Sequence, residues 1–146
     1  GTLIEEAPSL VLAEKGENLT NYSKNTYQVS FNTSTLTLNM SQGHDTWGIV
    51  GVYNNWGATP DTEMVLASDV EYGKRQYYLT ATLYLKADEG WKIRPDNTWT
   101  NDRGPDQLKY EGVEVLDGNF IVTEDGNYTI KWYFNKVEEM LVVVQN

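Results

Sequence analysis

Apolar and polar residues alternate one by one over three long stretches of this 146-residue chain, and this period of two constrains the fold more than any other feature. Successive side chains of a β-strand point to opposite faces, so such alternation predicts strands with one buried face. The first stretch predicts a hairpin across an Asn32-Thr33-Ser34 turn. Its apolar positions are Tyr27, Val29, Phe31, Leu36, Leu38 and Met40.

The other two stretches predict a long strand and a second hairpin. In residues 76–85 one face would carry Leu79, Ala81, Leu83 and Leu85, and the other face Tyr78, Thr80, Thr82 and Tyr84. The outward tyrosines stabilise the sheet by cross-strand contact, or else extend a binding face. In the last stretch we expect Tyr128, Ile130, Trp132 and Phe134 to be opposed across a turn by Met140, Val142 and Val144.

Strand composition indicates the fold class. Short strands rich in β-branched and aromatic residues, separated by Gly, Asn and Asp, are typical of antiparallel sandwiches. No segment longer than about two turns shows an amphipathic helical pattern. We therefore expect an all-β fold, an immunoglobulin-like antiparallel β-sandwich.

The length fits one domain with one core, but the two hairpins resemble each other. TYQVSFNTSTLTLNM and NYTIKWYFNKVEEMLVVV share Tyr-x-(Val/Ile), then Phe-Asn, then an alternating apolar strand. This similarity has two readings: the first hairpin ends a preceding tandem module, or it is simply another hairpin of one sandwich. We expect residues 1–45 to form an N-terminal segment with a β-hairpin and residues 46–146 to form a β-sandwich module.

Composition excludes several classes of function. The formal net charge of −10 repels nucleic acid and anionic lipid, so neither is an expected partner. Cysteine is absent, which excludes disulfides and thiolate chemistry. No apolar run approaches the roughly 18 residues of a membrane-spanning helix. We expect the chain to be a monomer.

Tryptophans in turn-rich sequence are the main functional signal. They lie in WGIVGVYNNWGATPDTEMV and WKIRPDNTWTNDRG, beside amide and cationic side chains. A pyranose lays its C–H face on an exposed indole, while its hydroxyls need hydrogen-bond partners. Trp56 and Trp99 are therefore candidates for a sugar-binding surface, although either ring could instead cap an end of the sandwich. Trp47 and Trp132 lie within strand patterns, and we expect both in the core.

The order of these motifs resembles a known family. WGIVG, an Asn-Trp-Gly turn, PDTEM, a Lys-Ile-Arg strand and the later Gly-Asn-Phe-Ile-Val stretch are similar to the repeated domains of the starch-utilisation lipoproteins SusE and SusF, over about residues 47–146. The resemblance implies an immunoglobulin-like module that binds α-glucan without cleaving it. It also implies that Trp56 and Trp99 form the sugar platform, with Lys92, Arg94 and Asn101 as hydrogen-bonding groups.

Strand geometry agrees with part of this assignment. In the strand Trp91-Lys92-Ile93-Arg94, alternate side chains point in opposite directions. Because Ile93 prefers the core, Trp91 should pack inward, and Lys92 and Arg94 should face outward on the side of the loop that carries Trp99. A proline cannot donate to a ladder, so the strand should end at residue 95 and release a loop over 96–104.

Catalysis and metal binding have weaker support. A glycosidase needs two carboxyl groups facing each other across a cleft, whereas Asp96, Asp102 and Asp106 lie in a predicted surface loop. His44 has no nucleophile or acid at a recognisable spacing. The loop over 96–102 matches no known calcium-loop spacing. We expect no enzymatic activity, no cofactor and no metal.

The resulting hypothesis is non-catalytic binding of α-glucan, as starch or maltooligosaccharide, at the bacterial cell surface within a polysaccharide-uptake system. The resemblance further implies an outer-membrane location, a lipid anchor outside this sequence, and contacts with other outer-membrane glycan-uptake proteins. The alternative is an immunoglobulin-like spacer or protein-interaction module, because a fold does not specify a function. Convergence of Trp56 and Trp99 on one exposed ledge with an arginine or lysine at its rim would favour sugar binding; burial of either ring beneath a loop would favour the spacer.

Overall fold

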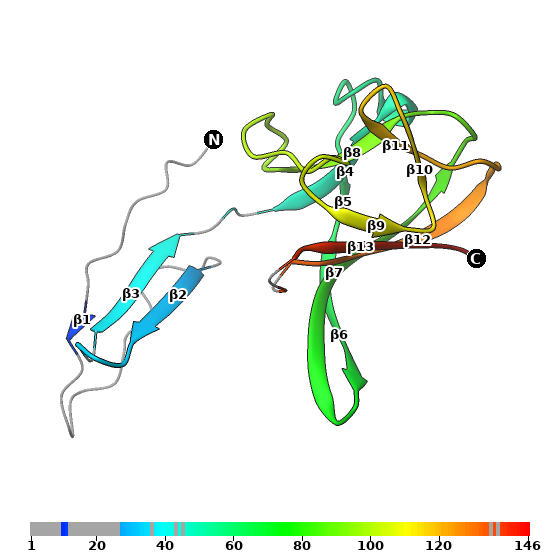
Figure 1. The fold of residues 1–146 in the computed structure, drawn as a ribbon. Coiled ribbons are helices and arrows are strands. Elements are labelled where there is room, and N and C mark those ends of the chain that lie inside the picture. The colour runs from blue at the N-terminus through cyan, green and yellow to red at the C-terminus, as the bar shows by residue number, and fades with distance from the viewer. Residues whose placement is uncertain are drawn as a thin grey trace. The chain divides into compact units, whose positions relative to one another are not determined.

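The computed structural model describes residues 10–11, 27–35, 37–42, 44, 46–134, 136 and 138–146. The chain divides into two compact units, residues 1–45 and residues 46–146. Each unit is described by itself (Figure 1).

The first unit contains a three-stranded antiparallel sheet in the order β1-β3-β2, formed by β1 (Leu10–Val11), β2 (Tyr27–Asn32) and β3 (Thr37–Gln42). The predicted hairpin is confirmed, because Val29 pairs with Met40 and Phe31 with Leu38. The Asn32 side chain closes the turn by accepting hydrogen bonds from the backbone N–H groups of residues 34 and 35, at 2.9 and 3.1 Å. The predicted apolar position Leu36 lies outside the described residues.

The second unit is built from two five-stranded sheets. The first has the order β10-β11-β8-β4-β5, formed by β4 (Trp47–Gly51), β5 (Thr62–Glu63), β8 (Trp91–Pro95), β10 (Glu114–Leu116) and β11 (Asn119–Ile121). The second has the order β6-β7-β12-β13-β9, formed by β6 (Val65–Glu71), β7 (Lys74–Leu85), β9 (Lys109–Glu111), β12 (Gly126–Tyr133) and β13 (Met140–Gln145). Strands within each sheet pair antiparallel, except that β9 runs parallel to β13. The only helical element among the described residues is the single turn η1 (Val52–Asn54).

The two sheets pack against each other and enclose one hydrophobic core, which confirms the predicted all-β sandwich (Figure 1). The first sheet contributes Trp91, Ile93 and Phe120, and the second contributes Ile130, Trp132 and Leu141, each at most 2% exposed. Trp47 packs against this core and meets Trp132 edge to face, with ring centroids 4.6 Å apart. Trp132 thus takes the core position predicted for it, whereas Trp47 is only partly buried and packs against the core.

The face of β13 that was predicted to be buried is wrong. Met140, Val142 and Val144 do not oppose the inward side chains of β12, since Trp132 pairs with Leu141 and Ile130 with Val143. Leu141 and Val143 are buried, whereas Val144 is 54% exposed. The sequence LVVV is apolar at every position, so its alternation does not reveal which face is buried. Pairing with β12 decides the register, and a shift of one residue exchanges the two faces.

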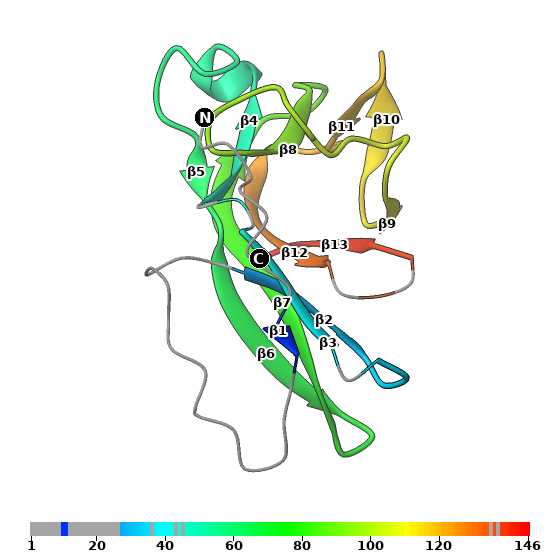
Figure 2. The same cartoon turned by 90° about the vertical axis from the view of Figure 1, so that its left-hand side faces the viewer.

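The hairpin of β6 and β7 extends beyond the end of β12 and projects from the sandwich (Figure 2). The φ angles of its two turn residues, Tyr72 and Gly73, are 49° and 73°. A type I′ hairpin turn requires a positive φ at both of these positions. On the outer face of the sheet, the rings of Tyr78 and Tyr133 lie 5.2 Å apart, so Tyr78 makes the cross-strand contact expected of it.

Candidate functional site

The turn that carries Trp56 follows β4 directly. After η1, Asn55, Trp56 and Gly57 have consecutive positive φ values of 49°, 54° and 102°. Such a backbone is costly for residues with a Cβ, so other contacts must stabilise it. One is the Trp56 N–H, which donates to the Gly51 carbonyl at 2.9 Å.

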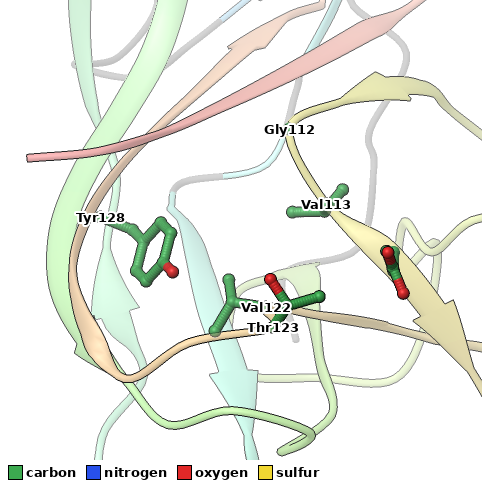
Figure 3. A pocket seen from close by; sticks show the side chains of 6 residues that line it. Gly112, Val113, Val122, Thr123 and Tyr128 are labelled. Atoms are coloured by element: carbon green, nitrogen blue, oxygen red, sulfur yellow. The ribbon is translucent and has the colours of Figure 1, made fainter.

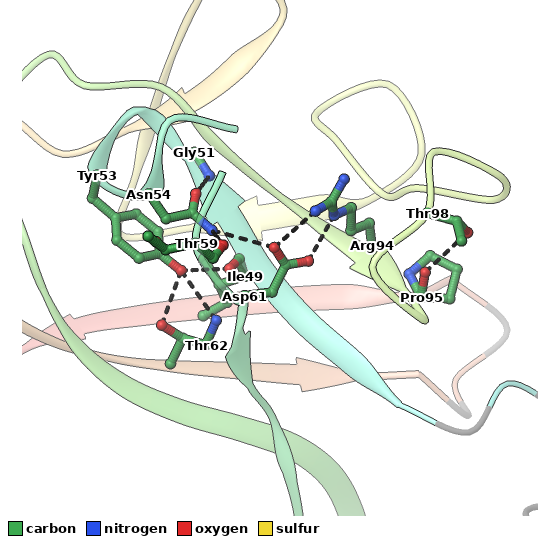
Figure 4. Close-up of polar contacts among 10 residues, drawn as sticks. All are labelled: Ile49, Gly51, Tyr53, Asn54, Thr59, Asp61, Thr62, Arg94, Pro95 and Thr98. Atoms are coloured by element: carbon green, nitrogen blue, oxygen red, sulfur yellow. Dashed lines mark hydrogen bonds and ion pairs between the residues drawn. The ribbon is translucent and has the colours of Figure 1, made fainter. Parts of the chain in front are cut away.

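Asn54 holds this turn together from inside (Figure 4). Its side chain is only 4% exposed, and its Oδ1 accepts a hydrogen bond from the Gly51 N–H at 3.0 Å. Its Nδ2 donates to the Thr59 carbonyl at 3.1 Å and to Asp61 Oδ1 at 3.2 Å. One buried amide therefore joins the start and the end of the loop over 51–61.

Asp61 connects the turn to the neighbouring strand β8. Arg94 donates from Nε to Asp61 Oδ2 at 2.6 Å and from Nη2 to Oδ1 at 2.9 Å (Figure 4). Both side chains are buried, at 5% and 3% exposure. The predicted outward direction of Arg94, toward the loop that carries Trp99, is therefore correct, but its side chain is not exposed to solvent. It does point away from the core residues Trp91 and Ile93, but Asp61 and the turn around residue 57 cover it.

Trp56 and Trp99 converge beside this ion pair. Their ring centroids are 6.0 Å apart and their planes are inclined by 44°. The Arg94 guanidinium carbon lies 4.6 Å from the centroid of the Trp99 ring. Trp99 is 49% exposed and Trp56 is half-buried, so two inclined indoles lie side by side at the surface.

Glycine is required at position 57 for this arrangement. A Cβ there would lie 2.3 Å from Arg94 Nη2, well inside any permitted contact. The bare backbone therefore lets the turn approach the guanidinium that supports the Trp99 ring.

The loop that carries Trp99 begins where β8 ends at Pro95, as predicted. Asp96 Oδ1 accepts a hydrogen bond from the Thr46 N–H at 2.9 Å. The Thr98 hydroxyl and N–H both donate to the Pro95 carbonyl, at 3.1 and 2.8 Å (Figure 4). The residues that lead into Trp99 are therefore held at several points.

Lys92 lies on β8, as Arg94 does, and Asn101 lies in the loop that carries Trp99. The two residues make different contacts. Lys92 forms an ion pair with Asp102 at 3.7 Å, and both side chains are a little over one-quarter exposed. Asn101 is exposed and its carbonyl accepts a hydrogen bond from Arg103 Nη1 at 2.8 Å. The structure thus brings Trp56, Trp99 and Arg94 into contact, while Lys92 and Asn101 lie on the flanking segments.

Three residues that organise the cluster were missed by sequence reasoning: Asn54, Gly57 and Asp61. All three occur in YNNWGATPD, where Asn, Gly and Asp are ordinary turn residues. No sequence spacing pairs Asp61 with Arg94, because the contact joins the loop before β5 to strand β8, 33 residues further along the chain. The only sequence signal for this ion pair is that an acidic residue, Asp61, follows the turn.

Tyr53 lies at the base of the same turn. Its hydroxyl donates to the Ile49 carbonyl, lies 2.9 Å from the Thr62 hydroxyl, and accepts a hydrogen bond from the Thr62 N–H at 3.2 Å (Figure 4). Burial of this hydroxyl raises the pKa of Tyr53 above its ordinary value of 10.0, although the hydrogen bonds from Thr62 act in the opposite direction. The neutral phenol is therefore the form that fits the folded chain.

A separate hollow of about 280 Å³ lies between the β9–β10 connection and the segment before β12 (Figure 3). It is lined by Gly112, Val113, Glu114, Val122, Thr123 and Tyr128. The Tyr128 hydroxyl already donates to the Glu124 carbonyl at 2.8 Å. This hollow contains neither of the two inclined indoles and no cationic side chain.

Two other kinds of feature are absent from the described residues. No group of three or more His, Asp or Glu side chains is arranged to hold a metal ion there. No helix in that part of the chain is long and apolar enough to cross a membrane.

Comparison with protein-family models, with curated proteins and with solved structures gives no match to this chain.

Proposed function

We propose that this protein binds α-glucan without cleaving it, at the bacterial cell surface and within a polysaccharide-uptake system. The observation that carries the proposal is the pair of surface indoles, Trp56 and Trp99, inclined by 44° at 6.0 Å. Their convergence beside the Arg94 guanidinium favours a sugar platform over a spacer module. The resemblance of the sequence to SusE and SusF domains supports the choice of glucan.

The angle between the rings favours a curved ligand. Two coplanar rings would suit a flat, ribbon-like chain, whereas two inclined rings can each receive the apolar face of one of two sugars that turn relative to each other. The α-1,4 linkage gives glucan a helical path, so successive glucose units present such turned faces. Starch and maltooligosaccharides are therefore the preferred ligands.

Arg94 acts in this proposal mainly as a support. Its Nε and Nη2 donors are engaged by Asp61, and its guanidinium lies over Trp99. A cation on one face of an indole leaves the opposite face for a sugar. Lys92 and Asn101, on the flanking strand and loop, are the proposed partners of the glucose hydroxyls.

The affinity of one module should be weak. An open site buries few sugar atoms, and each aromatic contact contributes about 0.5 to 1.5 kcal/mol beyond the area it buries. Strong attachment to starch would then come from several modules that bind one polymer. Weak, multivalent binding also lets a bound polysaccharide be released.

The test is affinity electrophoresis of the whole chain in gels that contain starch, dextran or a β-glucan. Retardation by starch alone, with retardation lost in a Trp56→Ala, Trp99→Ala double variant, is the expected result. A control variant that truncates an exposed tyrosine on the outer face of β7, Tyr84→Ala, should run like the unmodified chain. Absence of retardation in every gel would favour the spacer or protein-interaction module instead.

A further inference from the structure

Strand β6 is an unusually long free edge. The edge strands of the two sheets in the second unit are β5, β10, β9 and β6, of two, three, three and seven residues. Short edges offer few backbone groups to another chain, whereas a seven-residue edge offers a complete row. Of the described strands, only β7 pairs with β6.

The turn geometry identifies which groups on β6 are free. The two-residue turn makes Glu71 and Lys74 a hydrogen-bonded pair, and such pairs then alternate along the ladder. Residues 65, 67, 69 and 71 therefore bond to β7. Leu66, Ser68 and Val70 direct their N–H and carbonyl groups toward the open edge.

Apolar side chains accompany these free groups. Leu66 and Val70 are each 62% exposed, and Tyr77 on β7 shares their face because it pairs with Ser68. Protective edge strands usually carry a charge or a proline at such positions. The acidic residues of β6 instead point to the other face, where Asp69 accepts hydrogen bonds from Tyr78 and Lys131.

We propose that β6 is a self-association edge, which pairs antiparallel with β6 of a second copy of this chain about a two-fold axis at Ser68. Ser68 is the middle residue of Val65–Glu71, so this register uses the whole strand. The five-stranded sheet that ends in β6 would then continue into the same sheet of the second copy. Such an interface is isologous and closed, and it consumes both free edges. The proposal departs from the monomer expected from the sequence.

The order of side chains favours this register. Leu66 of one copy would face Val70 of the other, which gives two apolar pairs with Ser68 between them. On the opposite face Asp69 would face Ala67 and Glu71 would face Val65, so no two carboxylates lie directly opposite. A register centred on Val70 would instead place Asp69 against Glu71 and force the hairpin turns into the ladder.

Single cysteines test the register directly, because the chain has none of its own. Facing residues of a hydrogen-bonded antiparallel pair have Cα atoms about 5.5 Å apart, which suits a disulfide. Under mild oxidation the Ser68→Cys chain should form a covalent dimer. Leu66→Cys and Val70→Cys should each form no covalent dimer alone and should cross-link when mixed. Equal cross-linking by all three chains alone, or by none of them, would overturn the proposal.

The mass of the unmodified chain in solution is the second measurement. At about 0.15 M salt, which screens the repulsion between two chains of charge −10, light scattering should show twice 16.6 kDa at high protein concentration. Val70→Lys should return the mass to that of one chain. Val115→Lys, which places the same charge on the short edge strand β10, should leave the dimer intact. A single-chain mass for the unmodified protein at every concentration would refute the inference.

Discussion

Arg94 donates two hydrogen bonds to the Asp61 carboxylate, at 2.6 and 2.9 Å, and this buried pair connects the turn that carries Trp56 to the strand that precedes Trp99. The two loops are far apart in sequence, and each has its own backbone contacts. This pair, the Arg94 contact with the Trp99 ring and the contact between the two indoles link one loop to the other. The relative position of the two indoles therefore depends on a charge pair that lies below the surface.

Removal of the Asp61 carboxylate should show that the position of the indoles depends on this ion pair. Asp61→Ala leaves the Arg94 charge buried without a carboxylate, which typically costs about 3 to 5 kcal/mol of unfolding free energy. We expect a loss in this range by urea denaturation, and weaker retention on starch at temperatures where the variant remains folded. Asp61→Asn keeps the shape and one acceptor, so it should lose less. Stability of Asp61→Ala within about 1 kcal/mol of the unmodified chain would show that the pair is not structural.

Gly57 offers a second way to disturb the platform. Gly57→Ala adds a Cβ 2.3 Å from Arg94 Nη2, at a backbone φ of 102°. The matched control is Gly73→Ala, which also has positive φ, at 73°, but has no atom within 4 Å of the added Cβ. The control should lose about 1 to 2 kcal/mol from backbone strain alone, and Gly57→Ala more. Glucan binding should weaken only in Gly57→Ala; equal effects in the two variants would contradict a role for close approach to Arg94.

The fold was largely predictable because the buried face of most strands differs in polarity from the exposed face. The alternation in β7 and β12 identifies their core residues, and Pro95 identifies the end of β8. The same reasoning failed for β13, where apolar residues occupy both faces. A local pattern cannot resolve such a strand, since only its partner strand decides which side meets the core.

The candidate site was predictable only in part. Trp56 and Trp99 stood out because aromatic residues are unexpected among turn residues, and the structure does bring them together. The burial of Arg94 was not predictable. Strand alternation indicates which face of the sheet a side chain lies on, but it does not indicate which other residues cover that face. Asp61 comes from the loop that precedes β5 and binds the guanidinium that was expected to bond the ligand.

Tyr53 should make stability depend on pH in the alkaline range. The pKa of Tyr53 is raised in the folded chain by burial, so the unfolded chain loses this proton first as the pH rises through 10.0. Its contribution to stability is complete below that pH and is lost as the pH rises toward the folded pKa. Urea denaturation at about pH 9 and about pH 11 should therefore show a fall in unfolding free energy, and a smaller fall in Tyr53→Phe. An identical fall in both proteins would remove Tyr53 as a cause.

Trp99 should separate binding from folding. Its ring is 49% exposed and is not part of the hydrophobic core, so Trp99→Ala should change the melting temperature little. Loss of one of two stacking rings should weaken maltoheptaose binding by at least about tenfold, equivalent to roughly 1.4 kcal/mol. The control is Tyr84→Ala, which truncates a ring of similar exposure, 52%, on the outer face of β7. Calorimetry should show loss of binding heat in Trp99→Ala only. Unchanged affinity in Trp99→Ala, with maltoheptaose still bound by the unmodified chain, would place the sugar elsewhere on the sandwich.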